Sequence, residues 1–223
     1  MRDLIAQERF ELEVLNKLNT HGILRHLVFT GGTMLRLCLG MDRFSIDLDF
    51  WVWRSDPQWL FAELQGVFSR YYTLRDCAEK FYTLIFELKS ESYPRALKVE
   101  IRKSAPEGIK TEQAIAYSKY SDIQVLLRIV SLTDMMRLKA EAFLERGEIR
   151  DVYDMEFLLR KGVRLDLPED KLRSLLQKIE GLSRRDYTVK LGSLLEAPQR
   201  QYYVKEDFKL LKSAIKERLR ERR

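Results

Sequence analysis

Hydrophobic residues follow two different periods along the chain, and the change of period divides it. Residues 2–20 carry apolar positions at helical spacing, so we expect a helix that ends near Gly22. Most apolar runs from there to residue 130 are short and rich in aromatic and β-branched residues, which is typical of strands. Helical spacing returns afterwards. The pattern predicts an α+β protein with a β-rich lobe over residues 1–130 and a helical lobe over residues 131–223.

Short helices and links separate the predicted strands of the first lobe. The strands are Leu27–Phe29, Ile46–Trp53, Tyr71–Leu74, Phe81–Leu88, Ala96–Ile101 and Asp122–Val130. We expect one helix from Met34 to Leu39, ended by Gly40, and another from Gln58 to Ser69, opened by Pro57. The links between the later strands are short and predict antiparallel neighbours. The polar residues 104–121 are predicted to be a linker or a partly helical loop.

A glycine turn joins the first predicted strand to the first short helix. It reads Thr30-Gly31-Gly32-Thr33, and glycines allow both a sharp bend and the close approach of a ligand to the backbone. A helix that begins behind such a turn directs N–H groups and the positive end of its dipole toward a bound phosphate. The turn therefore predicts a contact with a phosphate-bearing ligand.

Two carboxylates in the next predicted strand are the candidate chemical centre. Asp47 and Asp49 are two residues apart, so both side chains point to one face of the strand, about 6–7 Å apart. Two neighbouring negative charges repel, and a hard cation removes that repulsion. Mg²⁺ is commonly held by one or two carboxylates together with substrate phosphates. The alternative is that both aspartates lie on a solvated strand face.

Glu100 is the candidate third metal ligand. It shares one face of the strand Ala96–Ile101 with Lys98. If this strand lies beside the strand of Asp47 and Asp49, Glu100 would complete the set of acids that a two-metal site needs. The alternative is an ordinary ion pair between Glu100 and Lys98.

The helical lobe carries a second group of charged residues. A segment that resembles a capping box, Ser131–Asp134, opens a helix that runs to about Arg146, and Gly147 ends it. In the next helical segment Asp151 and Asp154 are three residues apart and share a face near the helix N-terminus. Their simplest role would be to stabilise that first turn.

The net charge of +6 is concentrated at the C-terminal end of the chain. Residues 205–223 hold eight basic and four acidic residues, which favours a polyanionic partner such as nucleic acid. In the last predicted helix Lys209, Lys212, Lys216 and Arg220 form a basic stripe. This stripe would either bind a phosphate backbone or remain an ordinary solvated face.

The sequence also gives expectations about location. No apolar run approaches the 18 residues of a membrane span, and the first residues lack the apolar stretch of a signal peptide. The two cysteines, Cys38 and Cys77, are too few for a disulfide scaffold. We expect a cytoplasmic protein with no membrane partner.

Two motifs together resemble a known family. Gly31-Gly32-Thr33 is followed by Ser45-Ile46-Asp47-Leu48-Asp49, with thirteen residues between Thr33 and Asp47. This arrangement resembles the signature of DNA-polymerase-β-type nucleotidyltransferases, and more narrowly that of the AbiEii/AbiGii family, the toxins of type IV toxin–antitoxin (abortive infection) systems. The family's downstream pattern is matched in the same order by Lys139, Ala140 or Ala142, Arg146, Arg150, Asp151 and Asp154. The two segments together extend over residues 27–159.

The resemblance implies a fold and a reaction. The fold is a polymerase-β-like lobe, a mixed sheet with flanking helices, followed by a helical lobe. The reaction is Mg²⁺-dependent transfer of a nucleotide from an NTP to an RNA 3′ end, with tRNA as the expected acceptor and a cognate antitoxin as partner. Asp47 and Asp49 would hold the metal, with Glu100 as a third ligand. The nucleotide would be bound by Gly31, Gly32, Thr33, Ser45 and Lys139, and the acids Asp151 and Asp154 would complete the catalytic site.

Two alternatives to RNA-directed transfer stay open. The first is transfer of a nucleotide onto a protein hydroxyl, which the basic C-terminal stripe disfavours. The second is a nucleic-acid-binding domain of the same fold without turnover, which the intact pair Asp47 and Asp49 disfavours. P-loop and dinucleotide-binding proteins are excluded, because neither glycine-rich motif occurs in the sequence.

Overall fold

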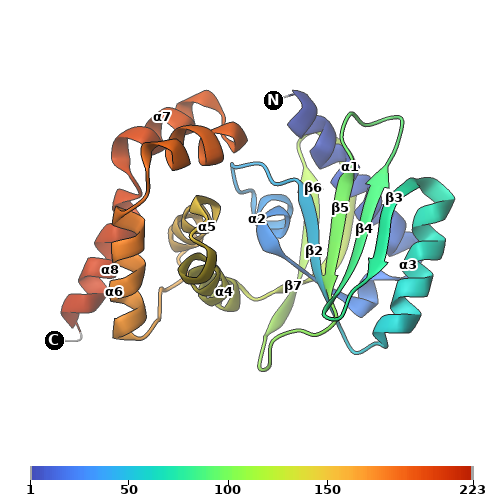
Figure 1. Ribbon diagram of the computed structural model, residues 1–223, viewed down its shortest axis with the longest axis horizontal. Helices are drawn as coiled ribbons and strands as arrows, with labels where there is room; N and C mark the ends of the chain where they lie inside the picture. The colour runs from blue at the N-terminus through green and yellow to red at the C-terminus, as the bar shows by residue number, and fades with distance from the viewer. Residues whose placement is uncertain (1, 222–223) are drawn as a thin grey trace. The chain divides into compact units, whose positions relative to one another are not determined.

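The chain forms two compact units, seen in a computed structural model that describes residues 2–221 (Figure 1). The first unit ends at Ser131 and the second begins at Leu132. The first is built around a β-sheet, and the second consists of helices and short helical turns. This is the α+β organisation that the two hydrophobic periods predict.

The sheet of the first unit has seven strands in the order β3-β4-β5-β2-β1-β7-β6. It is mixed, because β1 runs antiparallel to β2 but parallel to β7, and β2 runs parallel to β5. The strands are β1 (Leu27–Thr30), β2 (Asp47–Val52), β3 (Thr73–Glu79), β4 (Thr83–Lys89), β5 (Leu97–Arg102), β6 (Thr111–Ser118) and β7 (Ser121–Val130).

Three helices and a short 3₁₀ turn, Leu24–His26, accompany the sheet. Helix α1 (Arg2–Thr20) packs against β7, α2 (Gly31–Leu39) against β2 and β6, and α3 (Pro57–Tyr71) against β3. The helix α2 ends as predicted, because Gly40 adopts the left-handed conformation that closes a helix without steric strain. The apolar sides of these helices and strands form a core in which Phe10, Phe29 and Phe50 are almost fully buried.

The second unit has five helices among the described residues. They are α4 (Leu132–Arg146), α5 (Ile149–Arg160), α6 (Glu169–Glu180), α7 (Ala197–Glu206) and α8 (Lys209–Glu221). A π-helical turn, Asp186–Leu191, and a 3₁₀ turn, Gly192–Leu194, connect α6 to α7. Their core includes Tyr153, Tyr203 and Phe208.

The largest departure from the sequence pattern is strand β6. The sequence predicts a linker or partly helical loop over residues 104–121, and this is wrong for Thr111–Ser118, which pair with β7. The strand lies at the edge of the sheet, and several of its outward side chains are polar and exposed. Its buried residues near the end, Ala116 and Ser118, are small. An edge strand of this kind has little apolar alternation, which is why the pattern hides it.

Strand β3 also begins later than predicted. Tyr71 is the last residue of α3, and Tyr72 caps that helix, so the strand starts at Thr73 and extends to Glu79. β3 is likewise an edge strand, with mostly exposed side chains. The boundary between α3 and β3 lies later than predicted because Tyr71 belongs to the helix and Tyr72 caps it.

Candidate functional site

Asp47 and Asp49 lie on the side of β2 that faces away from the core. Both are half-buried, whereas Leu48 between them and Phe50 after them are buried. The strand therefore alternates as the sequence predicts. The two carboxylates share one face.

The glycine turn lies directly beside Asp49. Thr30, the last residue of β1, pairs with Asp49 across the antiparallel ladder, and Gly31 follows with a φ of +79°. A Cβ at Gly31 would overlap the carboxylate of Asp49. Glycine is therefore required at this position for two reasons. The backbone is in the left-handed region, and Asp49 leaves no room for a Cβ atom.

Gly32 is required by a second pair of side chains. A Cβ at this position would lie 2.5 Å from Nη2 of Arg43 and 2.9 Å from Oγ of Ser45. Arg43 is buried and donates a hydrogen bond from Nη1 to the carbonyl of Phe44 at 3.1 Å. The side chains of Arg43 and Ser45 thus lie close to the backbone of the turn. The sequence predicts that a ligand makes such a close approach. The predicted ligand contacts of Gly31 and Gly32 stay a prediction.

Thr33 fixes the helix α2 to the start of β2. Its hydroxyl is buried and donates a hydrogen bond to the carbonyl of Asp47 at 2.6 Å. Any contact of Thr33 with a nucleotide would accordingly use its backbone rather than this hydroxyl. Ser45 is half-buried, with its hydroxyl beside Gly32, and its predicted nucleotide contact is equally untested.

Glu100 stands next to the aspartates, as the metal hypothesis requires. β5 runs parallel to β2, with Glu100 opposite Asp49 and Lys98 opposite Asp47. Nζ of Lys98 lies 2.6 Å from the Glu100 carboxylate. Its hydrogen bond to Glu100 raises the pKa of Lys98, against the opposing effect of desolvation. Glu100 therefore lies beside Asp49, as the metal hypothesis requires, and also forms the ion pair with Lys98 that was the alternative.

The chemistry of these side chains fits a hard divalent cation. Asp47, Asp49 and Glu100 all offer carboxylate oxygens, which are the donors that Mg²⁺ prefers. Within residues 2–221, no three acid, histidine or cysteine side chains are already gathered closely enough to form a metal-ligand cluster. We would expect Asp47 and Asp49 to hold the cation, with Glu100 joining them only on release from Lys98.

A half-buried arginine that the sequence did not reveal holds the loop before β2. Arg36 of α2 forms an ion pair with Glu8 of α1 and donates hydrogen bonds at 2.9 Å to the carbonyls of Met41 and Asp42. Its guanidinium also lies 3.8 Å from the centre of the Phe44 ring. The network fixes the path of the chain into Asp47.

Helix α1 carries three buried polar residues at its sheet-facing side, although the pattern predicts polar residues only on its outer side. They are Gln7, Glu8 and Glu11. Both carboxylate oxygens of Glu11 are buried and have no hydrogen-bond partner among the described residues. Burial raises the pKa of Glu11, and the nearby charges of Glu8 and Asp47 raise it further, while Arg36 opposes them. The sequence signal was available, because Glu8 and Glu11 follow Leu4 at helical spacing and fall on the apolar face.

Four of the predicted residues of the helical unit form one charge-balanced cluster, in which only Arg146 is exposed. Nζ of Lys139 lies 3.2 Å from the Asp151 carboxylate and 2.7 Å from that of Asp154. Arg146 binds Asp151 through two hydrogen bonds of 2.8 Å. Lys139, Asp151 and Asp154 are all buried. Two acids therefore face two bases, and the aspartates hold Lys139 in one orientation.

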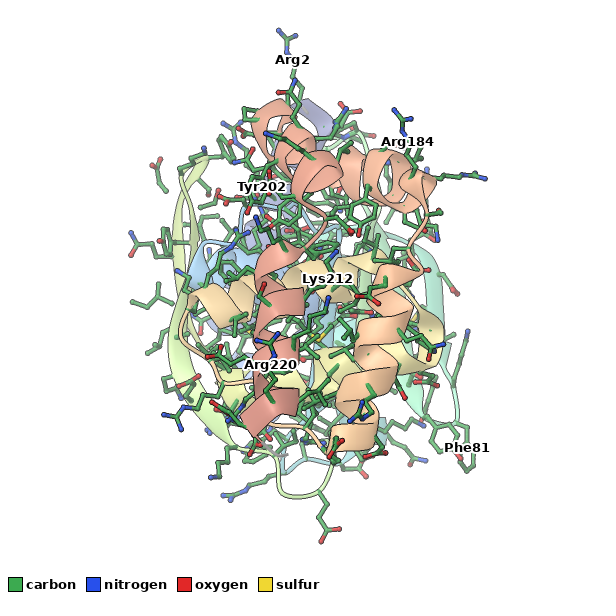
Figure 2. All side chains as sticks on the ribbon, turned by 90° about the vertical axis from the view of Figure 1, so that its left-hand side faces the viewer. Arg2, Phe81, Arg184, Tyr202, Lys212 and Arg220 are labelled. Carbon is green, nitrogen blue, oxygen red and sulfur yellow. The ribbon has the colours of Figure 1, made fainter. Side chains whose placement is uncertain are left out.

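The basic stripe of α8 is partly neutralised. Lys212, marked in Figure 2, pairs with Asp207 at 2.6 Å, and Lys216 pairs with Glu180 at 3.2 Å. Arg220 lies further along the same helix (Figure 2). These ion pairs favour the solvated-face interpretation over a dedicated phosphate-binding stripe.

Among the described residues, no helix combines the length and the apolar character that crossing a bilayer would need.

Comparison with known proteins gives both a family and a fold. The family of the nucleotidyl transferase AbiEii toxin of type IV toxin–antitoxin systems matches residues 13–221. JHP933 from Helicobacter pylori is similar in structure, with a TM-score of 0.59 and 19% identity over 96% of this chain and 94% of that one. A second H. pylori protein, provisionally named a nucleotidyltransferase, has the same TM-score and identity over 94% of this chain and 96% of its own. No curated protein sequence matches the chain.

Proposed function

The chain belongs to the AbiEii family of nucleotidyltransferase toxins of type IV toxin–antitoxin systems, and from this premise we propose a specific reaction for it. It transfers a nucleotide from an NTP to the 3′ hydroxyl of an RNA, with tRNA as the acceptor and Mg²⁺ as the cofactor. The family also implies an antitoxin partner, and we propose that this partner relieves the growth arrest that the transfer would cause.

One observation supports this proposal most strongly. Two aspartates on the outward face of β2 lie beside a glycine turn that opens a helix, and Gly31 is packed against Asp49 itself. Carboxylates suit a divalent cation, and a helix N-terminus suits a phosphate. Thr30 makes no side-chain capping hydrogen bond to the N-terminus of α2. A metal–triphosphate complex would engage both groups at once.

The side chains of the sheet unit would act mainly by positioning. Asp47 and Asp49 would hold the cation, and the N–H groups at the start of α2 would orient the phosphates. A bound Mg²⁺ would supply neutralisation of phosphate charge and a lower pKa for the attacking hydroxyl. Phosphoryl transfer needs little covalent chemistry from the protein, so fixed geometry and charge account for most of the catalysis.

Lys139 is the proposed phosphate contact of the helical unit, a role that the family pattern implies. Lysine is a compact charge on a flexible stem and suits phosphate oxygens. In this account Asp151 and Asp154 are positioning residues, because both bind Lys139 and neither is exposed. The ion pair between Arg146 and Asp151 would leave Asp154 as the main partner of Lys139.

The test is transfer of label from each of the four α-³²P-labelled NTPs, with total RNA and total protein offered in separate reactions. We expect wild-type protein to label RNA in a Mg²⁺-dependent manner and Asp47→Ala to label nothing. Arg75→Ala, an exposed substitution on β3, is the control and should retain wild-type transfer. Label on protein instead of RNA, or no label with any acceptor, would overturn the proposal.

A further inference from the structure

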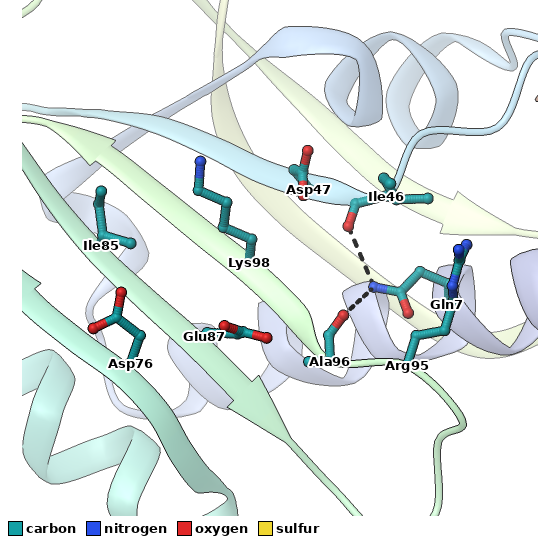
Figure 3. A pocket seen from close by; sticks show the side chains of 9 residues that line it. All are labelled: Gln7, Ile46, Asp47, Asp76, Ile85, Glu87, Arg95, Ala96 and Lys98. Atoms are coloured by element: carbon teal, nitrogen blue, oxygen red, sulfur yellow. Dashed lines mark hydrogen bonds between the residues drawn. The ribbon is translucent and has the colours of Figure 1, made fainter. Parts of the chain in front are cut away.

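A cavity of about 320 Å³ opens beside Asp47 (Figure 3). Its walls come from α1, from the beginnings of β2 and β5 with the residues that lead into them, and from strands β3 and β4. The lining residues are Gln7, Ile46, Asp47, Asp76, Ile85, Glu87, Arg95, Ala96 and Lys98. A volume of this size lies within the range of small-molecule sites and could hold a nucleoside.

Gln7 gives this cavity a polar group that needs a partner. The side chain is 1% exposed, and Nε2 donates to the carbonyls of Ile46 at 3.3 Å and Ala96 at 3.4 Å. Both bonds are drawn in Figure 3. Oε1 of the same amide is buried and has no hydrogen-bond partner among residues 2–221. A buried acceptor without a partner is costly, so a ligand with a donor group would stabilise it.

The cavity and the glycine turn lie on opposite sides of β2. The strand order β5-β2-β1 places the turn, which follows β1, on one side, and β5 with the cavity on the other. In phosphoryl transfer the attacking oxygen and the leaving oxygen are roughly in line across phosphorus. A triphosphate bound at the turn with its pyrophosphate directed away from β2 would therefore receive its attacker from the side of the cavity.

The charges around the cavity suit a nucleotide better than a small side chain. A row of paired residues crosses four strands, from Asp47 through Lys98 and Glu87 to Asp76. Carboxylates accept hydrogen bonds from ribose hydroxyls and base amino groups, and Arg95 can donate to a phosphate. Ile46 and Ile85 provide apolar surface for a base or sugar. A serine or threonine side chain would leave most of this volume unfilled.

We propose that this cavity is the acceptor site, and that it binds the terminal nucleoside of an RNA with its 3′ hydroxyl toward Asp47 and its 5′ phosphate on Arg95. This inference rests on the nucleotidyl transfer proposed above. In the reaction the acceptor oxygen forms a bond to the α-phosphorus, the bond from that phosphorus to the pyrophosphate oxygen breaks, and pyrophosphate leaves with the electron pair. The hydroxyl proton passes to water.

The decisive experiment compares two arginine variants of the full chain. Arg95 lines the cavity, and Arg102 is an exposed arginine of the neighbouring strand β5 that does not. Each substitution by alanine removes one positive charge, so nonspecific attraction to RNA falls equally in both. We expect Arg95→Ala to raise the KM for total tRNA about tenfold, the size of one charge-assisted hydrogen bond. The KM for NTP should stay within about twofold, and Arg102→Ala should resemble wild type.

A second variant fills the cavity instead of removing a charge. Ala96→Phe should weaken filter binding of total tRNA in the absence of NTP, while circular dichroism reports its folding. Should that variant fail to fold, the arginine pair decides alone. Equal KM values for tRNA in the two arginine variants, or a rise in the KM for NTP alone, would overturn the acceptor site while the wild type remains active. Absence of transfer by the wild type would instead refute the reaction itself, and the acceptor site with it.

Discussion

The two units each carry a pair of aspartates, and the pairs differ in exposure and in the kind of element that carries them. Asp47 and Asp49 alternate with buried residues on a strand and are half-buried. Asp151 and Asp154 share a helix face, are fully buried, and are bound by Lys139 and Arg146. We propose the half-buried pair as cation ligands, whereas the buried pair holds Lys139 and Arg146 in place. Exposure, rather than the Asp-rich sequence, is the basis of this distinction, because a cation from solvent can reach only the half-buried pair without local opening.

The largest expected effect concerns the two aspartates of strand β2, Asp47 and Asp49. Asp49→Ala should lower nucleotidyl transfer by about a thousandfold, the scale on which loss of one group that stabilises transition-state charge lowers kcat. The variant should still fold and melt cooperatively, because Asp49 is half-buried on the outward face of β2 and its truncation leaves no cavity in the core. Single-turnover transfer and a melting curve on the same preparation measure both. A variant that keeps its activity would show that the metal site has been misplaced.

For the two aspartates of helix α5, Asp151 and Asp154, we expect the main loss to be in stability. Asp154→Ala leaves buried Lys139 with only the carboxylate that it shares with Arg146. Breaking a buried ion pair costs about 3–5 kcal/mol, so we expect the free energy of unfolding to fall by about 3 kcal/mol in urea titrations. Glu141→Ala, which breaks only exposed pairs with Arg137 and Lys171, is the control and should change stability by less than about 1 kcal/mol. Equal losses in the two variants would contradict the assigned structural role.

A smaller effect tests the contact between the glycine turn and Asp49. Gly31 and Gly40 begin and follow the same helix, and both have positive φ. A Cβ at Gly40 meets nothing within 4 Å, whereas one at Gly31 meets the Asp49 carboxylate. Gly40→Ala should cost about 1 kcal/mol of stability from backbone strain alone. Gly31→Ala should cost about 1 kcal/mol more and should also impair transfer, because Asp49 must move.

The smallest effect concerns Glu11, whose buried carboxylate has no hydrogen-bond partner within residues 2–221. The pKa of Glu11 is raised, so the folded state holds a proton that the unfolded state releases as pH rises past the usual pKa of glutamate. Stability contributed by Glu11 is therefore greatest at low pH and falls as pH rises toward the folded-state pKa. Glu11→Gln should flatten this decline, measured as unfolding free energy against pH. Glu63→Gln, at an exposed position on α3, should leave the pH dependence unchanged.

The sequence predicts the strongly patterned parts of this fold well. The apolar alternation of β2 and β5 identifies both strands, and Gly40 correctly marks the C-terminal end of α2. The sequence predicts that α2 begins at Met34, whereas it begins three residues earlier, because Gly31 and Gly32 already belong to the helix. The other failures lie at the two sheet edges, where β6 and β3 have too few buried residues to show a period. Edge strands are specified by pairing with a neighbour, which is a long-range property that no local window contains.

The candidate site divides in the same way. Motif spacing is sufficient to nominate Asp47, Asp49 and the glycine turn, because strand geometry sets which side chains share a face. It could not place Gln7 beside the cavity or Arg36 beside Glu8, because these contacts join residues far apart in the chain. Motif spacing also could not show that the Thr33 hydroxyl donates a hydrogen bond to the Asp47 carbonyl.

The most direct test of the central claim is binding of a divalent cation, measured without turnover. Mn²⁺ serves as a paramagnetic substitute for Mg²⁺, and electron paramagnetic resonance counts the free ion in the presence of a nonhydrolysable NTP analogue that saturates each variant. We predict that Asp49→Asn weakens Mn²⁺ binding at least about tenfold, whereas Asp154→Asn binds Mn²⁺ as the wild type does. Unchanged binding in Asp49→Asn, together with lost binding in Asp154→Asn, would show that the cation belongs to the helical pair and would contradict the account.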